Sequence, residues 1–498
     1  MDNSNDLRRD IAKQTMQNDV RLNAAYIDGE WITIEASDSD TVDDHALYDP
    51  NLGEVIATTR LSTKFHVDRA VDAAAKAYPA WSQTSVSTRA HYLNAIADEM
   101  EQQFDKLVGL SVFNNGKPIE EAKIDVSDAI ACYRYYANLI TEQETWSEVS
   151  SESGIRLLKT YAPVGLCALI VPWNFPMVTT AWKLAPALAA GCTVLLKPSE
   201  VTLLPELMLG NILSAIQMPK GVVNILPGGA EVGAAMTSHP WIDKVSFTGS
   251  NLVGEKVMIQ AAKGIKDISL ELGGKSAIVV CADADIEYAC DLIIGGIFTN
   301  AGQICSATSR LLVHQEIAQS LFKRLKAKTE DLYIGDGFDT ATQMGPLVSK
   351  QQLAEVKKYM DIATAENLDC LTGGEILKRQ GYFATPTIYT DVPVSSQLWM
   401  EEIFGPVLVS ATFSDNVEAI RLANDSKYAL AATIVSADET AVLEMALQIE
   451  AGHIWINEQQ IVLPEAGWGG FKQSGIGREL GRDGLSAYQK SKHVLLPS

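Results

Sequence analysis

The feature that most constrains the fold is a regular alternation of short apolar runs with helical segments after residue 160. The runs end in Pro, Gly or Ser, and they read "VGLCALIVPWNFP", "CTVLLKPSE", "GVVNILPGG" and "KVSFTGS". The segments between them, 180–190, 205–217 and 230–237, have the apolar pattern of helices. Strands that alternate with helices form a parallel sheet covered on both faces. Because such sheets bind ligands at the carboxyl ends of their strands, the polar residues that follow these runs are candidates for a site.

A second alternating set extends from about residue 275 to 460. Its apolar runs are "SAIVV", "SRLLVH", "PTIYTDV", "VLVSATF", "AATIVS" and "GHIWIN". We therefore expect two α/β domains, which suits a chain of 498 residues.

The segments outside the two sets have simpler patterns. Residues 1–20 are polar and acidic, which predicts a loosely held N-terminal arm. "AAYIDGEWI" (24–32) predicts a strand and a turn, and the periodicity of 65–110 and 116–140 predicts helices. The end, "SKHVLLPS", predicts a short strand that can add to the sheet of another subunit.

Composition and charge narrow the class of protein. The net charge of −22 disfavours nucleic acid and anionic membranes as partners, and it is compatible with a cationic small molecule. No run of about 18 apolar residues occurs, so no membrane span is expected. The start, "MDNSNDLRRD", lacks the apolar core of a secretory signal. The 7 cysteines include no C-x-x-C pair, which argues against a metal site and favours a reducing, cytoplasmic setting.

Two stretches of the first set suit a dinucleotide. "FTGSNLVGEKVM" places Gly249 and Ser250 between a strand and a helix, where backbone amides can hold a phosphate. The stretch is not the G-x-G-x-x-G fingerprint, and such a turn also serves as an ordinary connection. In "LLKPSE", Lys197 can donate to ribose hydroxyls and Glu200 can accept from them. A carboxylate here would repel a 2′-phosphate, which favours NAD over NADP, although a plain surface pair has the same pattern.

Three polar side chains in apolar surroundings are candidates for a reacting centre. From its own stretch, "NAGQICSATSR", Cys305 is a nucleophile, a disulfide partner or a small apolar residue. Glu271 ends an apolar run, where a carboxylate with a raised pKa can act as a general base or form a salt bridge. Asn174 can stabilise an oxyanion or cap a helix. Together with a dinucleotide site, these three groups are the parts needed to oxidise an aldehyde through a thioester.

The order of motifs resembles the NAD(P)-dependent aldehyde dehydrogenase superfamily from about residue 24 to 495. The motifs are "PWNFP", "KPSE", "FTGS", "LELGGKS", "GQICSATSR", "EEIFGPV" and "GWGGFKQSGIGRELG". The resemblance implies an α/β fold with a Rossmann-like cofactor domain (21–139 and 160–272) and an α/β catalytic domain (273–483). It also implies a small β oligomerisation arm, formed by 140–159 and 484–498, and a homodimer or homotetramer.

The resemblance implies a role for each matching residue. Cys305 attacks the aldehyde, Asn174 and the Cys305 backbone N–H hold the oxyanion, and Glu271 activates the water that hydrolyses the thioester. Because the CoA-acylating members lack a base at the position of Glu271, a free acid is the expected product. Glu479 matches a second carboxylate near the water path. NAD is the expected cofactor, with NADP as the alternative, and the implied contacts are Trp173, Lys197, Ser199, Glu200, Gly249, Ser250, Leu272, Glu402 and Phe404.

Within the superfamily, the chain resembles betaine aldehyde and ω-aminoaldehyde dehydrogenases, which surround a cationic group with aromatic faces. The implied substrate-binding residues are Phe175, Trp182, Thr299, Ile304, Ser306 and Trp468, and Asp125 and Asp128 match acidic residues at the tunnel mouth. Phe175 stands where plant-type betaine aldehyde enzymes have Tyr, and Thr299 stands where an aromatic is common. The loop "EQQIVLPEAG" offers Glu458, Gln460 and Glu465 in place of aromatic and His residues. The incomplete aromatic box weakens the case for a trimethylammonium group, and the acidic residues suit a primary ammonium.

Three alternatives remain at this point. The substrate of a dehydrogenase can be a neutral aliphatic or aromatic aldehyde. A non-catalytic binding or structural protein could use the same scaffold, although the presence of Cys305, Glu271 and Asn174 disfavours it. A cysteine hydrolase needs a histidine beside the cysteine, and the nearest in sequence, His314, is expected at the far end of a strand.

Overall fold

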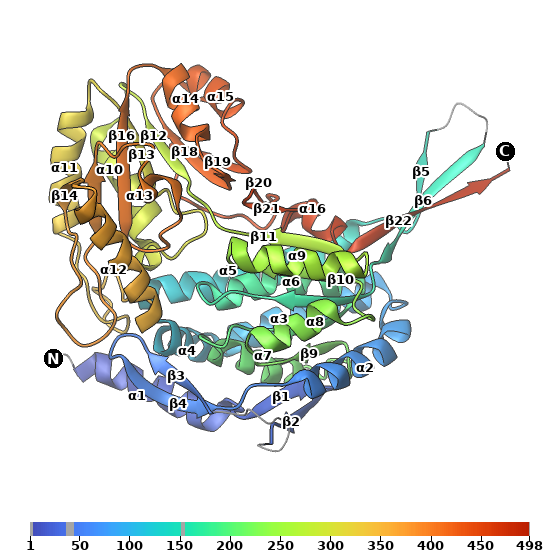
Figure 1. The fold of residues 1–498 in the computed structure, drawn as a ribbon. Coiled ribbons are helices and arrows are strands. Elements are labelled where there is room, and N and C mark those ends of the chain that lie inside the picture. The colour runs from blue at the N-terminus through green and yellow to red at the C-terminus, as the bar shows by residue number, and fades with distance from the viewer. Residues whose placement is uncertain (1–2, 36–43, 151–154, 498) are drawn as a thin grey trace.

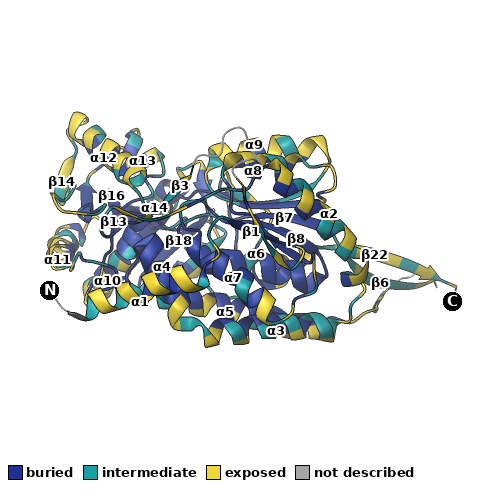
Figure 2. Cartoon of the chain, turned by 90° about the horizontal axis from the view of Figure 1, so that it is seen from below, coloured by how far each residue is buried: buried dark blue, intermediate teal, exposed yellow. Residues whose placement is uncertain are grey.

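Two mainly parallel sheets with their helices form the body of the molecule, and a narrow three-stranded sheet projects from it (Figure 1). The computed structural model describes residues 3–35, 44–150 and 155–497. None of the helices in these ranges is long and apolar enough to cross a lipid bilayer. The central strands of both sheets are buried beneath helices whose outer faces are exposed (Figure 2).

The first sheet contains the four apolar runs of the first alternating set. Its strand order is β2 (Glu30–Thr33), β1 (Ala24–Ile27), β9 (Val223–Ile225), β8 (Thr193–Lys197), β7 (Leu166–Ile170), β10 (Lys244–Thr248), β11 (Asp267–Glu271) and β21 (Gly475–Ile476). The strands from β9 to β11 are parallel, whereas β1, β2 and β21 run antiparallel to their neighbours. Successive side chains of β7 enter two different cores, Cys167 and Leu169 on one face and Ala168 and Ile170 on the other.

Helices cover both faces of the first sheet. On one face lie α2 (Lys64–Trp81), α8 (Ala230–Ser238) and α9 (Asn251–Lys263). On the other lie α3 (Val86–Gln102), α4 (Phe104–Asn115), α5 (Ile119–Glu142), α6 (Pro176–Ala190) and α7 (Leu204–Ala215). The hairpin of β3 (His45–Asp49) and β4 (Glu54–Thr59) completes this domain.

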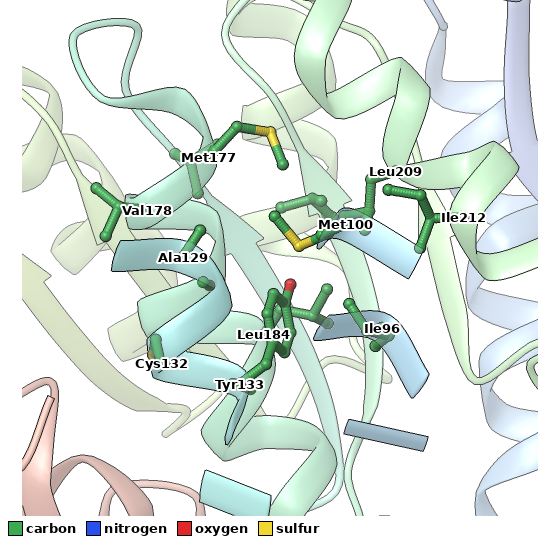
Figure 3. Packing of buried hydrophobic residues seen from close by; sticks show 14 of the residues in the cluster. Ile96, Met100, Ala129, Cys132, Tyr133, Met177, Val178, Leu184, Leu209 and Ile212 are labelled. Carbon is green, nitrogen blue, oxygen red and sulfur yellow. The ribbon is translucent and has the colours of Figure 1, made fainter. Parts of the chain in front are cut away.

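Helix α6 is fixed in the centre of this layer, which matters because it follows the "PWNFP" motif. It begins with Pro176 at its first turn and ends at Gly191, whose φ of 95° favours glycine. Figure 3 shows its side chains packed between α5, α3 and α7. The packed residues labelled there are Met177, Val178 and Leu184 of α6, Ala129, Cys132 and Tyr133 of α5, Ile96 and Met100 of α3, and Leu209 and Ile212 of α7.

The second sheet confirms the second alternating set. Its strand order is β14 (Asp369–Thr372), β15 (Thr387–Thr390), β16 (Val407–Phe413), β13 (Arg310–His314), β12 (Ala277–Val280), β18 (Ala431–Val435) and β19 (His453–Ile456). All neighbours are parallel except β14 and β15. The helices packed on it include α10 (Ile286–Phe298), α11 (Ala318–Glu330), α12 (Lys350–Ala365), α13 (Gln397–Met400), α14 (Asn416–Asn424) and α15 (Glu439–Ala446).

The projecting sheet has the strand order β22 (Gln489–Leu496), β6 (Arg156–Pro163) and β5 (Ser147–Val149). The expected terminal strand is therefore present, and it pairs with β6 of its own chain. The bounds differ from those expected, since α5 continues to Glu142 and β6 to Pro163. Residues 273–483 are also not confined to the second domain, because β21 completes the first sheet. A two-residue strand is too short to have a sequence signal of its own.

The prediction of a loose N-terminal arm is wrong for the residues described. Helix α1 (Asn3–Asp19) packs on α4, with Ala12 and Met16 buried one turn apart. Arg9 Nε lies 2.9 Å from Asp49 Oδ2, and Arg9 Nη2 lies 2.6 Å from Asp336 Oδ2. These contacts are distant in sequence, which is why polar composition alone suggested a free arm. Residues 1–2 of the expected arm lie outside the described residues.

Candidate active site

The predicted catalytic residues meet where the carboxyl ends of the first sheet face the second domain. Asn174 follows β7, and Glu271 is the last residue of β11. From the second domain, Cys305 follows the short 3-10 turn η2 (Thr299–Gly302), and Glu402 precedes β16. Asn174 and Glu271 therefore lie at strand ends, where the alternation predicts ligand-binding residues.

The backbone before Cys305 is a sharply bent loop. Asn300, Ala301 and Gly302 all have positive φ, at 48°, 53° and 74°. A side chain at Gly302 is impossible, because its Cβ would lie 2.1 Å from the carbonyl oxygen of Gly405. Two consecutive non-glycine residues in the left-handed region cost energy and are tolerated only where the surroundings hold them. The bend therefore presents Cys305 in one fixed orientation.

Amide groups hold this bend. The Gln303 Nε2 donates to the Asn300 carbonyl at 2.8 Å, and the Gln303 Oε1 accepts from the Val348 N–H at 2.9 Å. Glu121, on α5, accepts the Asn300 N–H at 2.9 Å, and burial raises the pKa of this carboxyl to about 7. The Asn174 Nδ2 donates to the Gln303 carbonyl at 2.9 Å. An amide NH₂ has two protons, so Asn174 is fixed beside the catalytic loop with a second donor for an oxyanion.

A buried ion pair, Lys117 with Asp125, holds the "PWNFP" loop in place. The Lys117 Nζ lies 3.3 Å from Asp125 Oδ2 and donates to the Asn174 carbonyl at 2.9 Å. The same Nζ lies 4.1 Å from the centre of the Phe175 ring, a cation–π distance. Asp125 Oδ1 accepts the Val178 N–H at 3.0 Å, at the start of α6. One lysine therefore fixes the position of the amide donor and of the ring that follows it.

This pairing corrects the expectation for Asp125. Asp125 is 1% exposed and both its oxygens are engaged, so it cannot face an ammonium at a tunnel mouth. Asp128, one turn further along α5, is exposed. Partial desolvation of its carboxyl and the nearby charge of Asp125 raise the pKa of Asp128 to about 6. Of the two aspartates, only Asp128 remains available to a cationic ligand.

Cys305 and Glu271 both have raised pKa values. Burial and the charges of Glu271 and Glu402 raise the pKa of the Cys305 thiol to about 12. Burial and the nearby Glu479 raise the pKa of Glu271 well above its ordinary value. Both oxygens of Glu271 are buried without a hydrogen-bond partner among the described residues. A carboxylate with a raised pKa is a strong proton acceptor, so Glu271 can serve as a base for a thiol or a water.

Behind Glu271 lies a polar group formed by Lys183, Ser246 and Glu479. The Lys183 Nζ forms an ion pair with Glu479 Oε1 and donates to the Ser246 Oγ at 3.3 Å. The Ser246 Oγ donates to the same Glu479 oxygen at 3.2 Å, while Glu479 Oε2 has no partner among the described residues. Glu479 and Trp468 exchange backbone hydrogen bonds of 2.6 and 2.8 Å. This arrangement is compatible with the predicted place of Glu479 near a water path.

The predicted nicotinamide side is formed by Glu402 and Phe404. Glu402 Oε1 accepts the Gly274 N–H at 2.9 Å, and burial raises the pKa of this carboxyl to about 7. A Cβ at Gly273 would lie 2.1 Å from Glu402 Oε2, so the glycine makes room for the carboxyl. The Phe404 ring meets the Trp173 ring edge-to-face at 5.3 Å, with a backbone φ of 55° at Phe404. A bulky residue with positive φ at this place is a strained feature typical of a ligand site.

The predicted adenosine side contains Lys197, Ser199 and Glu200. The Lys197 Nζ is buried and donates to the Gly228 carbonyl at 2.5 Å, and it lies 3.4 Å from Glu200 Oε2. Ser199 Oγ accepts the Val201 N–H at 3.3 Å. The Glu200 carboxylate has lone pairs left to accept hydrogen bonds from ribose hydroxyls. Lys197 as donor and Glu200 as acceptor fit the predicted contacts with the NAD ribose.

The predicted pyrophosphate turn is also present. Ser250 caps helix α9 by accepting the Val253 N–H, and the Gly249 N–H donates to the Glu271 carbonyl at 3.1 Å. Leu272 packs over Gly254, whose Cβ would lie 2.6 Å from the leucine Cδ2. The first turn of a helix offers backbone N–H groups to a phosphate. The described residues therefore fit a dinucleotide from β8 to β11.

The predicted aromatic box is part of a larger cluster. Trp468 lies 5.6 Å from Trp182, 5.4 Å from His453 and 6.2 Å from Trp455, measured between ring centres. Trp468 is 2% exposed, whereas Trp182 and His453 are partly exposed. Sequence reasoning missed His453 and Trp455, although their i, i+2 spacing in "GHIWIN" puts both on one face of a strand.

The remaining predicted substrate residues lie around the catalytic loop. Ser306 Oγ donates to Gln460 Oε1 at 3.3 Å, which connects Cys305 to the loop after β19. Ile304 packs against the core of the second sheet, and Thr299 begins the turn η2. Lys117 and Lys183 were not anticipated. Lys183 stands in the apolar helical run "TTAWKLAPALAA", which was a usable signal, whereas Lys117 in "NNGKPIEE" had none.

The cysteine hydrolase alternative lacks its histidine. His314 ends β13, while Cys305 precedes the start of that strand. The His314 ring lies against Phe413, with Nε2 3.1 Å from the Ser414 carbonyl oxygen. His314 is thus held at the far end of the strand, as expected.

Comparison with known proteins places these observations in a family. The model of the aldehyde dehydrogenase family matches residues 36–494. Aminoaldehyde dehydrogenase 1 of Pisum sativum, named as peroxisomal, is 43% identical over 482 residues, covering 94% of each chain. The chloroplastic betaine aldehyde dehydrogenase of Beta vulgaris is 40% identical and covers 94% of this chain and 95% of its own.

Solved structures confirm the expected fold. Betaine aldehyde dehydrogenase from Staphylococcus aureus, solved with NAD⁺, has a TM-score of 0.94 and 36% identity, and the match covers 98% of this chain and 97% of the other. An aldehyde dehydrogenase from Bacillus cereus, also solved with NAD⁺, has a TM-score of 0.93 at 36% identity, covering 97% and 98%. These matches leave no support for a non-catalytic scaffold. The chain belongs to the aldehyde dehydrogenase family.

Proposed function

We propose that this enzyme oxidises a small cationic aldehyde to its carboxylic acid with NAD, through a thioester on Cys305. The observation that carries the proposal is the unpartnered buried carboxyl of Glu271, which lies close enough to Cys305 to raise the pKa of its thiol. Asn174 is tied to the backbone two residues before the same cysteine. A nucleophile, a base and an oxyanion donor therefore meet at one point.

In the first step, the Cys305 Sγ loses its proton and bonds to the carbonyl carbon of the aldehyde. The raised pKa of the thiol means that a base must take this proton, and Glu271 is the carboxylate in place. The carbonyl oxygen becomes an oxyanion, which Asn174 Nδ2 and the Cys305 N–H stabilise by donation.

In the second step, the tetrahedral carbon loses its hydrogen with both bonding electrons, and the carbonyl re-forms as a thioester. Bound NAD supplies the acceptor for this hydride. Glu402 and Phe404 would orient the ribose and the ring, and Lys197 and Glu200 would hold the adenosine ribose. The NAD⁺ complexes of the similar Staphylococcus and Bacillus enzymes support this assignment.

Before the third step, Glu271 releases the proton it took from the thiol to solvent and becomes a carboxylate again. In the third step, Glu271 takes a proton from water, and the water oxygen bonds to the thioester carbon. The carbon–sulfur bond breaks, and the leaving sulfur takes the proton back from Glu271, which restores the Cys305 thiol as the acid leaves. The Lys183–Ser246–Glu479 group lies near Glu271 without a direct hydrogen bond to it, so a bridging water would complete a route for the released proton.

The names of the relatives and the local chemistry support a cationic substrate. Curated relatives are called aminoaldehyde and betaine aldehyde dehydrogenases. In this chain, Asp128 is an exposed carboxylate on α5, and Trp182 is a partly exposed aromatic ring. Glu458 and Glu465 add negative charge on the loop that follows β19. Either betaine aldehyde or an ω-aminoaldehyde fits these groups.

The assembly and location are further parts of the proposal. The arm of β5, β6 and β22 leaves two strand edges open among the described residues, and open edges favour addition to a second chain. We expect a homodimer or homotetramer held in part by this arm. A cytoplasmic location is proposed from the chemistry of the cysteines, which include no disulfide among the described residues.

A substrate panel tests the function. Formation of NADH is measured with betaine aldehyde, 4-aminobutanal, 3-aminopropanal, 4-trimethylaminobutanal and hexanal, with NAD and NADP in parallel. The proposal predicts the highest kcat/KM for a cationic aldehyde with NAD. A kcat/KM for hexanal that equals or exceeds that of every cationic aldehyde would refute the substrate class.

A further inference from the structure

His453 is an imidazole without a polar partner inside the aromatic cluster. Its ring centre lies 4.7 Å from that of Trp455 and 5.4 Å from that of Trp468. Within residues 3–35, 44–150 and 155–497 the ring has aromatic neighbours but no hydrogen-bonding side chain. Because the ring is only half-buried, its nitrogens can bond to water.

The cluster that contains His453 reaches Trp182, one of the predicted substrate-binding residues, through Trp468. Trp455 and Trp468 belong to the same apolar core against which Phe175, Trp182 and Cys305 pack. Trp468 is 2% exposed and offers little surface to a ligand. The lysine over the Phe175 ring occupies one face of that ring. Phe175 is partly exposed but has a lysine on one face, so the partly exposed aromatic rings without a cation on them are Trp182 and His453.

We propose that His453 is a specificity residue whose charge decides whether the aromatic wall accepts the cationic end of the aldehyde. The inference rests on the proposed function, because it concerns the substrate of that same site. A neutral imidazole presents a π face, which suits an ammonium group. An imidazolium at the same place repels an ammonium group, because few polar atoms are present to screen the two charges.

The surroundings of His453 keep it neutral at ordinary pH. Burial lowers the pKa of His453, and no carboxylate of the described residues contacts its ring. Beside it on β18, the paired residue is Ala431, which has no charge. The charged groups of the neighbouring elements are Lys183 on α6, Glu479 beside Trp468, and Glu458 and Glu465 on the following loop. Because burial lowers the pKa of His453 from the ordinary histidine value, the ring should gain its proton only on acidification below that value.

The test compares two aldehydes of the same shape that differ in charge. Betaine aldehyde carries a trimethylammonium group, and 3,3-dimethylbutanal carries a tert-butyl group in its place. The ratio of their kcat/KM values is measured with the holoenzyme between about pH 8 and pH 5.5. Titration of Cys305 changes both values alike and cancels in the ratio, whereas protonation of the carboxylates Asp128 and Glu402 affects the cation more and is measured in the His453 variant.

For the wild-type enzyme, we expect the ratio to fall about tenfold on acidification. His453→Gln keeps a planar side chain that gains no proton, so its ratio should fall much less, by only the part that protonation of Asp128 contributes. His314→Gln, at the far end of β13, is the matched control and should behave like the wild type. A ratio that does not change with pH in the wild type, or that falls equally in His453→Gln, would overturn the proposal.

The same data separate this inference from the proposed function. A ratio below one at pH 8 contradicts the preference for a cation, whereas the change of the ratio with pH decides the role of His453. A measurement that needs no turnover is the binding of tetramethylammonium, followed by tryptophan fluorescence. Its Kd should rise more on acidification in the wild type than in His453→Gln, where only Asp128 and other carboxylates titrate, and an equal rise in both would count against His453.

Discussion

The molecule contains two buried groups of lysine and carboxylate close to the same catalytic loop, and they differ in how far their polar atoms are satisfied. In the first, Lys117 reaches both Asp125 and the Asn174 carbonyl, and Asp125 uses both oxygens. In the second, Lys183 pairs with one oxygen of Glu479. The other oxygen of Glu479 and both oxygens of Glu271 have no partner among the described residues.

The difference distinguishes a group that supports the loop from a group that can take part in the reaction. A buried polar group without a partner costs free energy, so it persists only where something else requires it. The Lys117 group has no spare capacity and can only hold the "PWNFP" loop in place. The Glu271 group has spare acceptors, which a water or a proton can fill during turnover. Five changes test this division, beginning with the reacting atom itself.

The largest effect is expected from Cys305→Ala. Without the sulfur no thioester forms, so kcat should fall by about 10⁴-fold or more. The free energy of unfolding should change little, and NAD should still bind in a calorimetric titration. Cys370→Ala, at an exposed cysteine, is the matched control and should keep full activity. Substantial turnover by the first variant would remove the nucleophile assignment.

Glu271→Gln should slow turnover by about 10²- to 10⁴-fold, because the amide cannot take a proton. If water attack is the blocked step, a rapid-mixing experiment should show a burst of NADH followed by slow release of acid. Glu206 on α7 provides a control, since it is equally buried and both its oxygens also lack partners among the described residues. Glu206→Gln should leave turnover unchanged. An unimpaired steady-state rate in Glu271→Gln would mean that another group is the base.

Lys117→Met should act mainly on the fold. Breaking a buried pair leaves Asp125 uncompensated, and we expect a loss of about 3–5 kcal/mol in the free energy of unfolding, measured with urea. The double variant Lys117→Met/Asp125→Leu should recover part of this loss. Lys123→Met removes an exposed pair with Glu120 on the same helix and should cost about 1 kcal/mol or less. If the double variant is no more stable than the single one, the ion pair is not the support we describe.

The pH dependence of stability should follow the raised carboxyls. The pKa values of Glu121 and Glu402 are about 7 in the folded chain, above that of a free glutamate. The folded state therefore binds more protons than the unfolded state between about pH 4.5 and pH 7. Each group should lower the free energy of unfolding by about 1–3 kcal/mol as the pH rises through this window. Glu402→Gln should reduce the slope, and a stability that rises over the window would contradict the assignment.

The smallest effect is expected from Asp128→Asn. The loss of one exposed charge should raise KM for 4-aminobutanal about threefold and leave KM for hexanal unchanged. Asp125→Asn, three positions earlier, should instead lower stability and affect both aldehydes alike. Equal effects of the two variants on KM would show that both aspartates face the substrate.

Much of the fold could be predicted from the sequence, because its strands end in recognisable residues. The apolar runs, each followed by Pro, Gly or Ser, predict the strands β7, β8, β10 and β11. They also predict which polar residues stand at the ends of these strands. Helix α1 was missed because polar composition was given more weight than the spacing of Ala12 and Met16. The ion pairs of Arg9 with Asp49 and Asp336 join segments far apart in the chain, which no local pattern contains.

The candidate site was predicted in its residues but not in its pairings. Asn174, Glu271 and Cys305 stand out as polar groups in apolar runs. The sequence cannot show that Asp125 is occupied by Lys117 while Asp128 is free, because this depends on where α5 meets the "PWNFP" loop. His453 was missed because strand spacing identifies a face but not the side chains that it meets. Which side chain pairs with which is therefore the feature of the site that only the three-dimensional structure shows.

The two-residue strand β21 has a mechanical consequence for the catalytic cycle. It pairs Gly475 with Glu271 and Ile476 with Leu270, so a segment of the second domain is bonded to the strand that carries the base. A hinge motion that separated the two domains would have to break this ladder beside Glu271. We therefore expect aldehyde and acid to enter and leave through a channel between the domains that opens by side-chain movements. Opening and closing of the two domains is not expected to control their passage. The kcat should accordingly change when channel-lining side chains are made larger. It should not change with solvent viscosity, which would slow a motion of whole domains.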